Sequence, residues 1–343
     1  MTDISTDSSS DSWSARAVAR LAHLAPSWFV VVMGWCGLAQ AWLRAEGLLG
    51  EWALGAGLVA AAFALVVFGL LGVACIVRLQ VHPDAVHADL LHPVRHAFMA
   101  ALPISMLLLA SLGTHLFGGT DAMLDMLWTV LWLMGSVLQL WATWWVLARW
   151  LRAKENRGLM WQHFTPVLFI PVVGNVLAPI GGVPLGLGAW ATAQFGVGLF
   201  LWPVLVALLV VRMVEAGPLP ARMAPTLFVS LAPPSLVGLS LLTLHAPIDV
   251  VWAVWGMGLF FLGWALTQIR VIGSQSFAMP HWGMSFPCAA FTTLTLRLAQ
   301  TPEGHWLNVP ALVLLGLVTL LILGLSLHTW RGLRHGTILV PEQ

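Results

Sequence analysis

Long apolar stretches separated by short polar turns dominate the chain. A hydrocarbon core about 30 Å thick needs roughly 20 apolar residues per crossing helix. Ten stretches are of about this length, at residues 27–45, 52–78, 94–118, 124–149, 165–187, 190–213, 224–246, 249–271, 282–300 and 305–330. They are too long for the ten-residue strands of a membrane β-barrel. The pattern predicts an all-α polytopic membrane protein with ten transmembrane helices in five helical hairpins.

The odd-numbered and even-numbered stretches differ at their centres. Proline lies inside the third, fifth, seventh and ninth stretches, and Gly34 and Gly37 take its place in the first. Broken backbone at membrane depth is tolerated where it is buried or lines a wet cavity, whereas tryptophan suits lipid-facing surface. The fourth and eighth stretches carry Trp128, Trp132, Trp141, Trp144, Trp145, Trp252, Trp255 and Trp264. We therefore expect odd-numbered helices around a central pore and even-numbered helices outside; prolines that only bend packed helices are the alternative.

Basic residues divide unevenly between the two ends of these helices. Of the 15 Lys and Arg residues, all but Arg44 and Arg297 fall on the side of the N-terminus if ten helices cross the membrane. Cytoplasmic segments carry the excess of Lys and Arg, so both termini are expected in the cytoplasm. We expect residues 1–24 to be a disordered tail, residues 25–332 the membrane domain and residues 333–343 a second cytoplasmic tail.

Composition excludes several classes of protein. Charged residues make up 8% of the chain and the mean hydropathy is +0.89, whereas soluble domains carry about 25% charged residues. A net charge of +1 gives no reason to expect a nucleic-acid partner. Cys36, Cys75 and Cys288 lie in apolar stretches and do not indicate a disulfide scaffold. Nucleotide-binding glycine motifs are missing from the sequence, and no cofactor is expected.

The residues along the expected pathway favour anions over cations. Asp and Glu are missing from the middle of the ten stretches, although cation channels and proton pumps usually need buried carboxylates. Arg95 and Arg297 lie near opposite mouths and are expected to attract anions, unless they only reach to the membrane interface. The histidines at 82, 87, 92 and 96 match no zinc-binding spacing. They are expected in a solvated loop, with no metal.

The segment Gly-Met-Ser-Phe-Pro at residues 283–287 supplies a candidate gate. Five helices in a ring at ordinary packing distances leave a lumen about 3 Å in radius. Phe286 lies next to the helix break at Pro287, and its ring could close such a lumen by rotating about χ1. On pattern alone, Phe286 could equally be a core aromatic residue.

Several segments also resemble a known family. They are PSWFVVVMG at 26–34, HPVRHAFMAALPISM at 92–106, TPVLFIPVVGNVLAPIGG at 165–182, APTLFVSLAPPSL at 224–236 and WGMSFPCAAFTTLTLRLAQ at 282–300. Together they resemble the tellurite-resistance/dicarboxylate transporter family, which includes bacterial TehA and the slow-type anion channels of plant guard cells. The resemblance implies ten helices, a central pore lined by the odd helices, and a trimer of separate pores.

The resemblance also implies roles for particular residues. Phe286 is expected to be the gate, and the pore-lining residues are expected to be Gly34, Pro103, Pro171, Asn175, Pro233 and Pro287. The sequence departs from this family pattern at one place. After Met33-Gly34 the relatives commonly continue with Thr-Gly, whereas this chain continues with Trp35-Cys36-Gly37. If Trp35 faced the lumen, it would narrow the pore.

These observations predict transport of small inorganic or carboxylate anions across a bacterial inner membrane. The resemblance supplies chloride, nitrate, sulfite, tellurite and C4-dicarboxylates as candidates. The leading expectation is a gated channel-like pore in a homotrimer within the lipid bilayer. A secondary active carrier for dicarboxylates, or for sulfite or tellurite efflux, is the alternative. An enzyme is not expected, because convergent histidines or carboxylates at mid-membrane depth are missing from the sequence.

Overall fold

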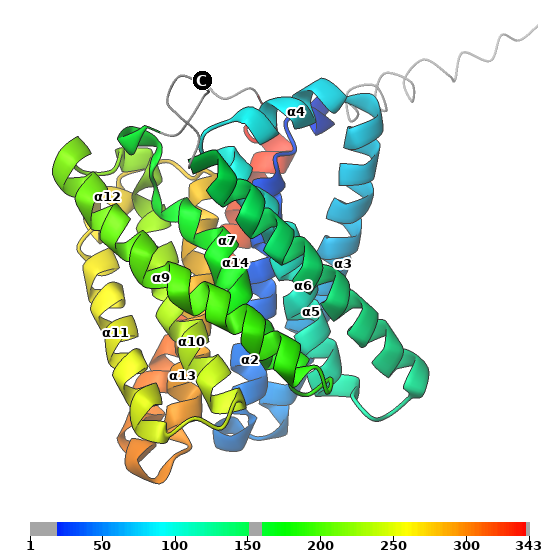
Figure 1. Ribbon diagram of the computed structural model, residues 1–343, viewed down its shortest axis with the longest axis vertical. Helices are drawn as coiled ribbons and strands as arrows, with labels where there is room; N and C mark the ends of the chain where they lie inside the picture. Colours follow the sequence, from blue (N-terminus) through cyan, green and yellow to red (C-terminus); the bar gives the residue numbers. More distant parts are fainter. Residues whose placement is uncertain (1–18, 151–159, 341–343) are drawn as a thin grey trace, which may run out of the picture.

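A computed structural model describes residues 19–150 and 160–340 of the chain. All the regular structure in these residues is helical, which confirms the all-α prediction (Figure 1). Eight helices in this part of the chain are long and apolar enough to cross a membrane. The fifth expected stretch instead forms a run of shorter helices, and the ninth, η7 with α13, is not among the eight. A total of ten crossings therefore stays a prediction.

Each odd-numbered stretch begins as a 3-10 helix and continues as an α-helix. These five inner segments are η1 (Pro26–Trp28) with α2 (Phe29–Leu49), η2 (Arg95–Ala100) with α5 (Ala101–Phe117), η5 (Pro166–Phe169) with α7 (Ile170–Val176) and α8 (Ala178–Gly182), η6 (Ala221–Leu231) with α10 (Ala232–Thr243), and η7 (Met279–Met284) with α13 (Ser285–Ala299). The even-numbered stretches are α3 (Glu51–Val81), α6 (Ala122–Trp150), α9 (Gly188–Ala216), α11 (Ile248–Leu266) and α14 (Asn308–His335). Short helices α4 (Pro83–Leu91), α12 (Ile269–Gly273), η4 (Trp161–His163) and η8 (Pro302–Leu307) connect them.

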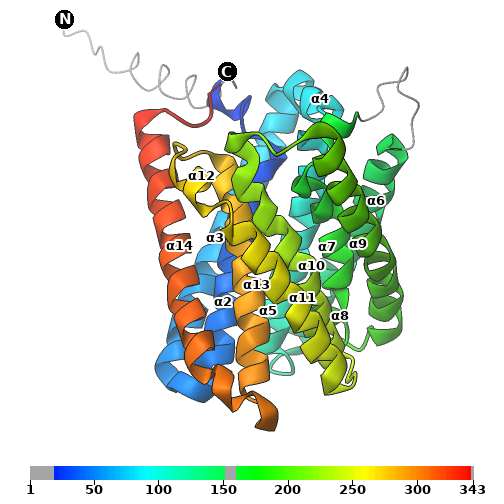
Figure 2. The ribbon, with the colours of Figure 1, turned by 90° about the vertical axis from the view of Figure 1, so that its left-hand side faces the viewer.

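The inner segments close into a ring. Helix α2 contacts α5, α5 contacts α7 and α8, these contact α10, α10 contacts α13, and α13 returns to α2. Each inner segment also packs against the outer helix that follows it, as α2 against α3, α5 against α6, α7 against α9, α10 against α11 and α13 against α14. The described residues thus form five hairpins, each with one helix in the ring and one outside it (Figures 1 and 2).

Burial separates the same two sets of helices. In the most apolar 18-residue window, 78% of residues are buried in both Pro26–Leu49 and Arg95–Phe117, and 83% in Ala221–Thr243. The corresponding share is 17% in Glu51–Val81 and 28% in Ile248–Leu266. Side chains on the outer helices therefore present most of their apolar surface outward, as lipid-facing helices do. The expected division into inner and outer helices agrees with this burial.

The inner prolines lie where 3-10 helix changes into α-helix. Pro171 and Pro233 are the second residues of their α-helices, and Pro103 and Pro287 are the third. Proline is tolerated in the first turn because an N–H group there has no partner within the helix. Each proline thus falls near the middle of a crossing segment and at the start of an α-helix. At these positions each inner segment changes from a 3-10 helix to an α-helix.

Two ends of the molecule are named below. The terminal end carries α4, α12 and the described chain ends near Arg20 and Val340; the hairpin end carries the turns near Gly50, Gly119, Gly186, His245 and Thr301 (Figure 2). All five described inner segments run from the terminal end to the hairpin end. Helix α14 continues to His335, beyond the expected domain boundary at 332. Residues 1–18 and 341–343 of the expected tails lie outside the described residues.

Two local expectations are wrong. Trp132 is fully buried, because it packs against Gly181 and Gly182 of α8 instead of facing lipid; Trp141 and Trp144 on the same helix are exposed as expected. The histidine-rich segment is not a simple loop. It contains α4, which lies across the terminal end, and the side chain of Asp89 on this helix is buried.

Candidate functional site

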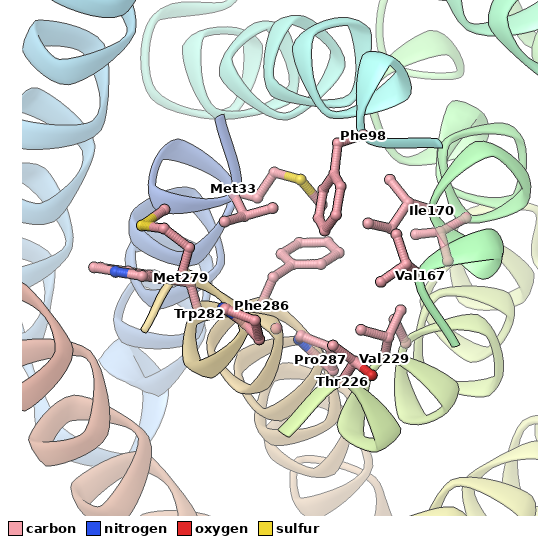
Figure 3. A pocket seen from close by; sticks show the side chains of 15 residues that line it. Met33, Phe98, Val167, Ile170, Thr226, Val229, Met279, Trp282, Phe286 and Pro287 are labelled. Atoms are coloured by element: carbon pink, nitrogen blue, oxygen red, sulfur yellow. The ribbon is translucent and has the colours of Figure 1, made fainter. Parts of the chain in front are cut away.

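An apolar cavity lies inside the ring, toward the terminal end. Every inner segment contributes to its lining, which comprises Val30, Met33, Phe98, Val167, Ile170, Val173, Thr226, Val229, Ala232, Met279, Pro280, Trp282, Gly283, Phe286 and Pro287 (Figure 3). Its volume is about 30 Å³, which is room for about two water molecules. Thr226 contributes the only side-chain hydroxyl among these residues, so the cavity offers few partners to a hydrated ion.

Phe286 occupies the middle of this cavity. Its ring lies among side chains from the other inner segments (Figure 3), and the residue is 3% exposed. The close approach of α2 to α13 sets this position. A Cβ atom at Gly37 would lie 3.1 Å from Cδ2 of Phe286, and one at Gly34 would lie 2.5 Å from Oγ of Ser285. The two glycines thus allow α13 to bring Phe286 into the ring; Gly34 itself packs on Ser285 and Trp282.

Phe98 lies beside Phe286 on the opposite wall of the cavity (Figure 3). It belongs to η2, the 3-10 helix that precedes α5. We did not expect this residue from the sequence, because a phenylalanine in an apolar stretch carries no signal of its own. Phe98 and Phe286 thus bring two aromatic rings from different segments into the apolar cavity.

A second cavity, the basic vestibule, opens inside the ring toward the hairpin end. It is lined by Gln40, Leu43, Arg44, Ser111, Leu112, His115, Ile180, Leu239, Thr243, Thr293 and Arg297. Again every inner segment contributes, and the volume is about 60 Å³. Arg297 was expected at a mouth, whereas Arg44 and His115 were not. Their positions near the ends of α2 and α5 are also those of ordinary interfacial residues, so the sequence alone could not single them out.

A short apolar barrier separates the two cavities. Along α2 the lining passes from Met33 in the apolar cavity to Gln40 in the basic vestibule. Seven residues of α-helix span about 10 Å. The intervening stretch of α2 includes Cys36 and Gly37, which face no water: Cys36 is fully buried, and Gly37 packs against Phe286 and Ala289. The two cavities thus lie in line through the ring, and the described side chains close the space between them.

The other expected pore-lining residues take different places. Pro287 lines the apolar cavity, whereas Pro103, Pro171 and Pro233 are buried outside the lining of both cavities. Asn175 also points away from the ring. Its Nδ2 donates to Oγ1 of Thr143 on α6 at 2.8 Å and to the Pro171 carbonyl at 2.9 Å. The second of these bonds satisfies a backbone acceptor of the broken fifth segment, and the first ties that segment to α6.

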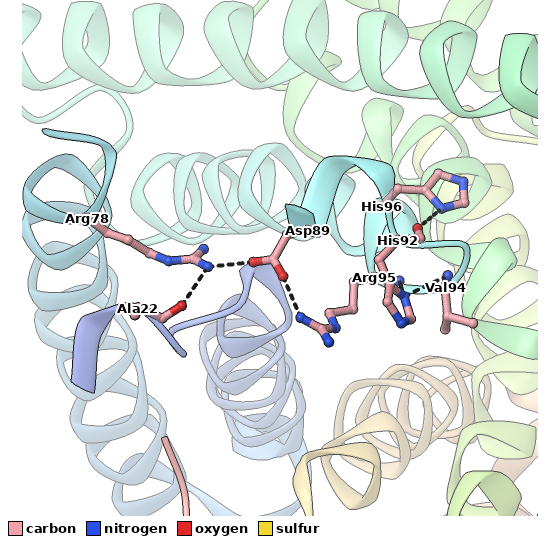
Figure 4. Close-up of polar contacts among 7 residues, drawn as sticks. All are labelled: Ala22, Arg78, Asp89, His92, Val94, Arg95 and His96. Carbon is pink, nitrogen blue, oxygen red and sulfur yellow. Dashed lines mark hydrogen bonds and ion pairs between the residues drawn. The ribbon is translucent and has the colours of Figure 1, made fainter. Parts of the chain in front are cut away.

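Arg95 belongs to a buried ion-pair cluster at the terminal end. Its Nη1 donates to Oδ1 of Asp89 at 2.7 Å, and Nη2 of Arg78 donates to Oδ2 at 2.7 Å (Figure 4). Arg78 also donates to the Ala22 carbonyl. In the same region, Nδ1 of His92 accepts hydrogen bonds from the backbone N–H groups of Val94 and Arg95. The cluster ties α3, α4 and η2 together, so part of the positive charge of Arg95 is already neutralised.

Trp35 faces away from the lumen. Its Nε1 donates to Oγ of Ser326 on α14 at 3.2 Å, and its ring packs against Phe63 of α3 with centroids 4.3 Å apart. The tryptophan therefore fills the contact between α2 and two outer helices and does not narrow the pathway. Residues Trp35-Cys36 at this position change the outer packing of α2 instead.

The described residues offer no cluster of three or more His, Cys, Asp or Glu side chains that could hold a metal ion. What the ring provides is two cavities in line, a smaller apolar one and a larger basic one, with closely packed side chains between them. Such an arrangement is typical of a membrane channel or transporter in a closed state.

Sequence comparison assigns the family. The SLAC1 profile, described as voltage-dependent anion channel, matches residues 23–330, and the chain belongs to this family. An uncharacterized transporter of Methanocaldococcus jannaschii is 27% identical, over 78% of this chain and 82% of its own. The S-type anion channels SLAH2 and SLAH3 of Arabidopsis thaliana are 24% and 26% identical, over 70% and 72% of this chain. The alignments span 45% and 38% of those two plant proteins.

Proposed function

We propose that the protein is a gated channel for small anions and that Phe286 is its gate. The observation that carries this proposal is the pair of cavities in line within one closed ring, with Phe286 in the narrower one. We place the protein in a bacterial inner membrane with the terminal end in the cytoplasm. Among the described residues, Arg44 and Arg297 lie toward the hairpin end and the other arginines toward the terminal end, and this excess supports the orientation.

Helix dipoles supply one reason for anion selectivity. Each inner α-helix continues a 3-10 helix without a break, because the N–H groups of Phe29, Ala101, Ala232 and Ser285 donate to carbonyls of the preceding 3-10 turn. The positive ends of the dipoles therefore lie where the inner segments begin, at the terminal end. These ends lower the energy of an anion, and raise that of a cation, on the way from the terminal end into the apolar cavity.

The basic vestibule supplies the second reason. Arg44, His115 and Arg297 are the charged or ionisable residues in its lining, which includes no Asp or Glu among the described residues. The inner helices end at this level, where their dipoles are negative. The two arginines offset these negative ends and leave a net positive entrance. Anions would therefore be concentrated at the hairpin end before they reach the barrier.

The direction of the segments favours a channel over a carrier. Many secondary carriers are built from inverted repeats, whose equivalent helices run in opposite directions across the membrane. Here all five described inner segments run the same way, and each is followed by an outer helix. Movement of one aromatic side chain is then a simpler way to open the passage than rocking of two halves.

The transported ions and the assembly are proposed at a coarser level. Chloride, nitrate, sulfite, tellurite and C4-dicarboxylates are candidates, and the monovalent ions suit the narrow apolar cavity best. We also propose a homotrimer in which each chain contains its own passage. Outer helices such as α3 and α14 expose many large apolar side chains that could serve contacts between copies.

The proposal is tested by reconstituting the purified protein in planar bilayers under anion substitution. The reversal potential should follow the anion gradient and stay constant when sodium replaces potassium. A reversal potential that follows the cation would refute anion transport. Flux that saturates at turnover rates far below measurable single-channel current would instead identify a carrier.

A further inference from the structure

The basic vestibule concentrates positive charge that no carboxylate in its lining balances among the described residues. Arg44 on α2 and Arg297 on α13 line the same cavity and lie close enough for each to repel the other's charge. The ion pairs among the described residues join Arg78 and Arg95 to Asp89 and lie at the opposite end of the ring. An arginine pair left in this state is a site for an anion with more than one charged oxygen.

A further polar group in the vestibule lacks a partner. Nε2 of Gln40, one helical turn from Arg44, is buried and makes no hydrogen bond among the described residues. Buried polar atoms in proteins are almost always hydrogen-bonded, so an unused N–H donor indicates a ligand or water. Thr293, one turn before Arg297, also lines the vestibule, but its hydroxyl donates to the Ala289 carbonyl at 2.9 Å, so the donors left for an anion are those of Gln40, Arg44 and Arg297. The donors come from two neighbouring helices of the ring.

Resting on the proposed function, we infer that the basic vestibule binds a small divalent oxyanion and that the bound dianion blocks the channel from the hairpin end. The volume of about 60 Å³ holds about four water molecules, which suits a small tetrahedral or pyramidal oxyanion. Two guanidinium groups can each donate two N–H bonds to oxygens of one such anion. A single halide would neutralise only one of the two charges.

A dianion held in the vestibule cannot readily continue through the ring. The next chamber has a volume of about 30 Å³ and an almost wholly apolar lining that includes Phe286. The cost of moving an ion from water into an apolar medium rises with the square of its charge, so a dianion meets about four times the penalty of a monovalent ion of equal size. The same vestibule therefore attracts divalent anions most strongly and transmits them least.

The block should depend on the side of addition. Chloride current would be recorded in excised patches of both orientations, with sodium sulfate added at constant ionic strength. Sulfate at the hairpin end should reduce chloride current, whereas sulfate at the terminal end should reduce it at least tenfold less effectively. Arg44→Gln and Arg297→Gln should each raise the half-blocking sulfate concentration about tenfold or more, because each removes charge-assisted hydrogen bonds. Arg270→Gln, an exposed residue at the terminal end, is the matched control and should leave the block unchanged.

Binding is measured separately from current by thermal unfolding in detergent. A ligand that binds only the folded protein raises the melting temperature. Sulfate should stabilise the wild type and the Arg270→Gln variant more than chloride does, and this difference should disappear in the Arg44→Gln/Arg297→Gln double variant. Equal effects of sulfate and chloride, block from both sides, or sulfate permeation as fast as that of chloride would each overturn the inference. Absence of anion current from both the wild type and the Phe286→Ala variant would refute the proposed function, and the melting temperatures would still decide whether the site exists.

Discussion

Phe286→Ala separates the two roles that an aromatic residue can have inside the ring. As a gate, the ring of Phe286 keeps the passage closed by staying buried in the apolar cavity, where it is 3% exposed. A phenylalanine side chain is about 1.5–3 kcal/mol more stable buried than exposed, so burial favours the closed position by about this amount. Each 1.4 kcal/mol corresponds to a factor of ten, so removing the ring should raise anion conductance about 10-fold to 100-fold.

The alternative is that Phe286 only packs the core. Truncating a buried phenylalanine costs about 3–5 kcal/mol of stability, and conductance would then stay at the wild-type level or fall with the amount of folded protein. The two roles thus predict opposite signs for the change in current. Single-channel recording of the purified variant, together with its melting temperature, measures both quantities on the same sample.

Phe291 provides a matched control on the same helix. It is 2% exposed, and its ring stacks on Trp255 of α11 with centroids 6.0 Å apart, on the side away from the lumen. Phe291→Ala should therefore lower the melting temperature about as much as Phe286→Ala without raising the current. Equal gains of current in the two variants, or no gain from Phe286→Ala in a folded protein, would refute the gate.

Three further changes test the surroundings of the passage. Phe98→Ala should raise the current about threefold to tenfold, less than Phe286→Ala, because this second ring is only partly buried; single-channel recording checks the order. Asp89→Asn should lower the free energy of unfolding by about 3–5 kcal/mol, because it leaves a buried guanidinium without its carboxylate. Asp84→Asn, at an exposed position of the same helix, is the control and should cost less than about 1 kcal/mol; thermal unfolding measures both. Gly37→Ala should cost about 1–3 kcal/mol in the same assay, because the added methyl group would lie 2.9 Å from Cβ of Ala289; an unchanged melting temperature would contradict the close approach of α2 and α13.

The ring of inner segments could be predicted because single residues within each segment, the inner prolines, cause it. Pro103, Pro171, Pro233 and Pro287 mark backbone that cannot stay regular, and irregular backbone at membrane depth has to be buried. The structure adds that each proline lies in the first turn of an α-helix that follows a 3-10 helix. Sequence spacing alone does not distinguish this arrangement from a kink in a continuous helix.

The chemistry of the passage depended on contacts that the sequence does not encode locally. Arg95 and Arg297 look alike as basic residues near helix ends, yet Arg95 is paired with Asp89 six residues earlier and Arg297 shares a cavity with Arg44 on a distant helix. Trp35 shows the same limit, because its direction is set by Ser326 near the other end of the chain. Which face of a helix meets the lumen is decided by how all five segments pack together.

In the proposed channel, gate and selectivity reside in different parts of the ring, and the physical reasons for this are separate. An apolar cavity closed by an aromatic ring excludes every hydrated ion, because any charge loses its water there. On the same proposal, the sign of the permeant ion is set instead by the positive starts of the inner segments at the terminal end and by Arg44 and Arg297 in the vestibule. None of these charges moves when Phe286 turns aside. An opening that displaces only one uncharged side chain therefore changes how much current passes and leaves unchanged which ions carry it.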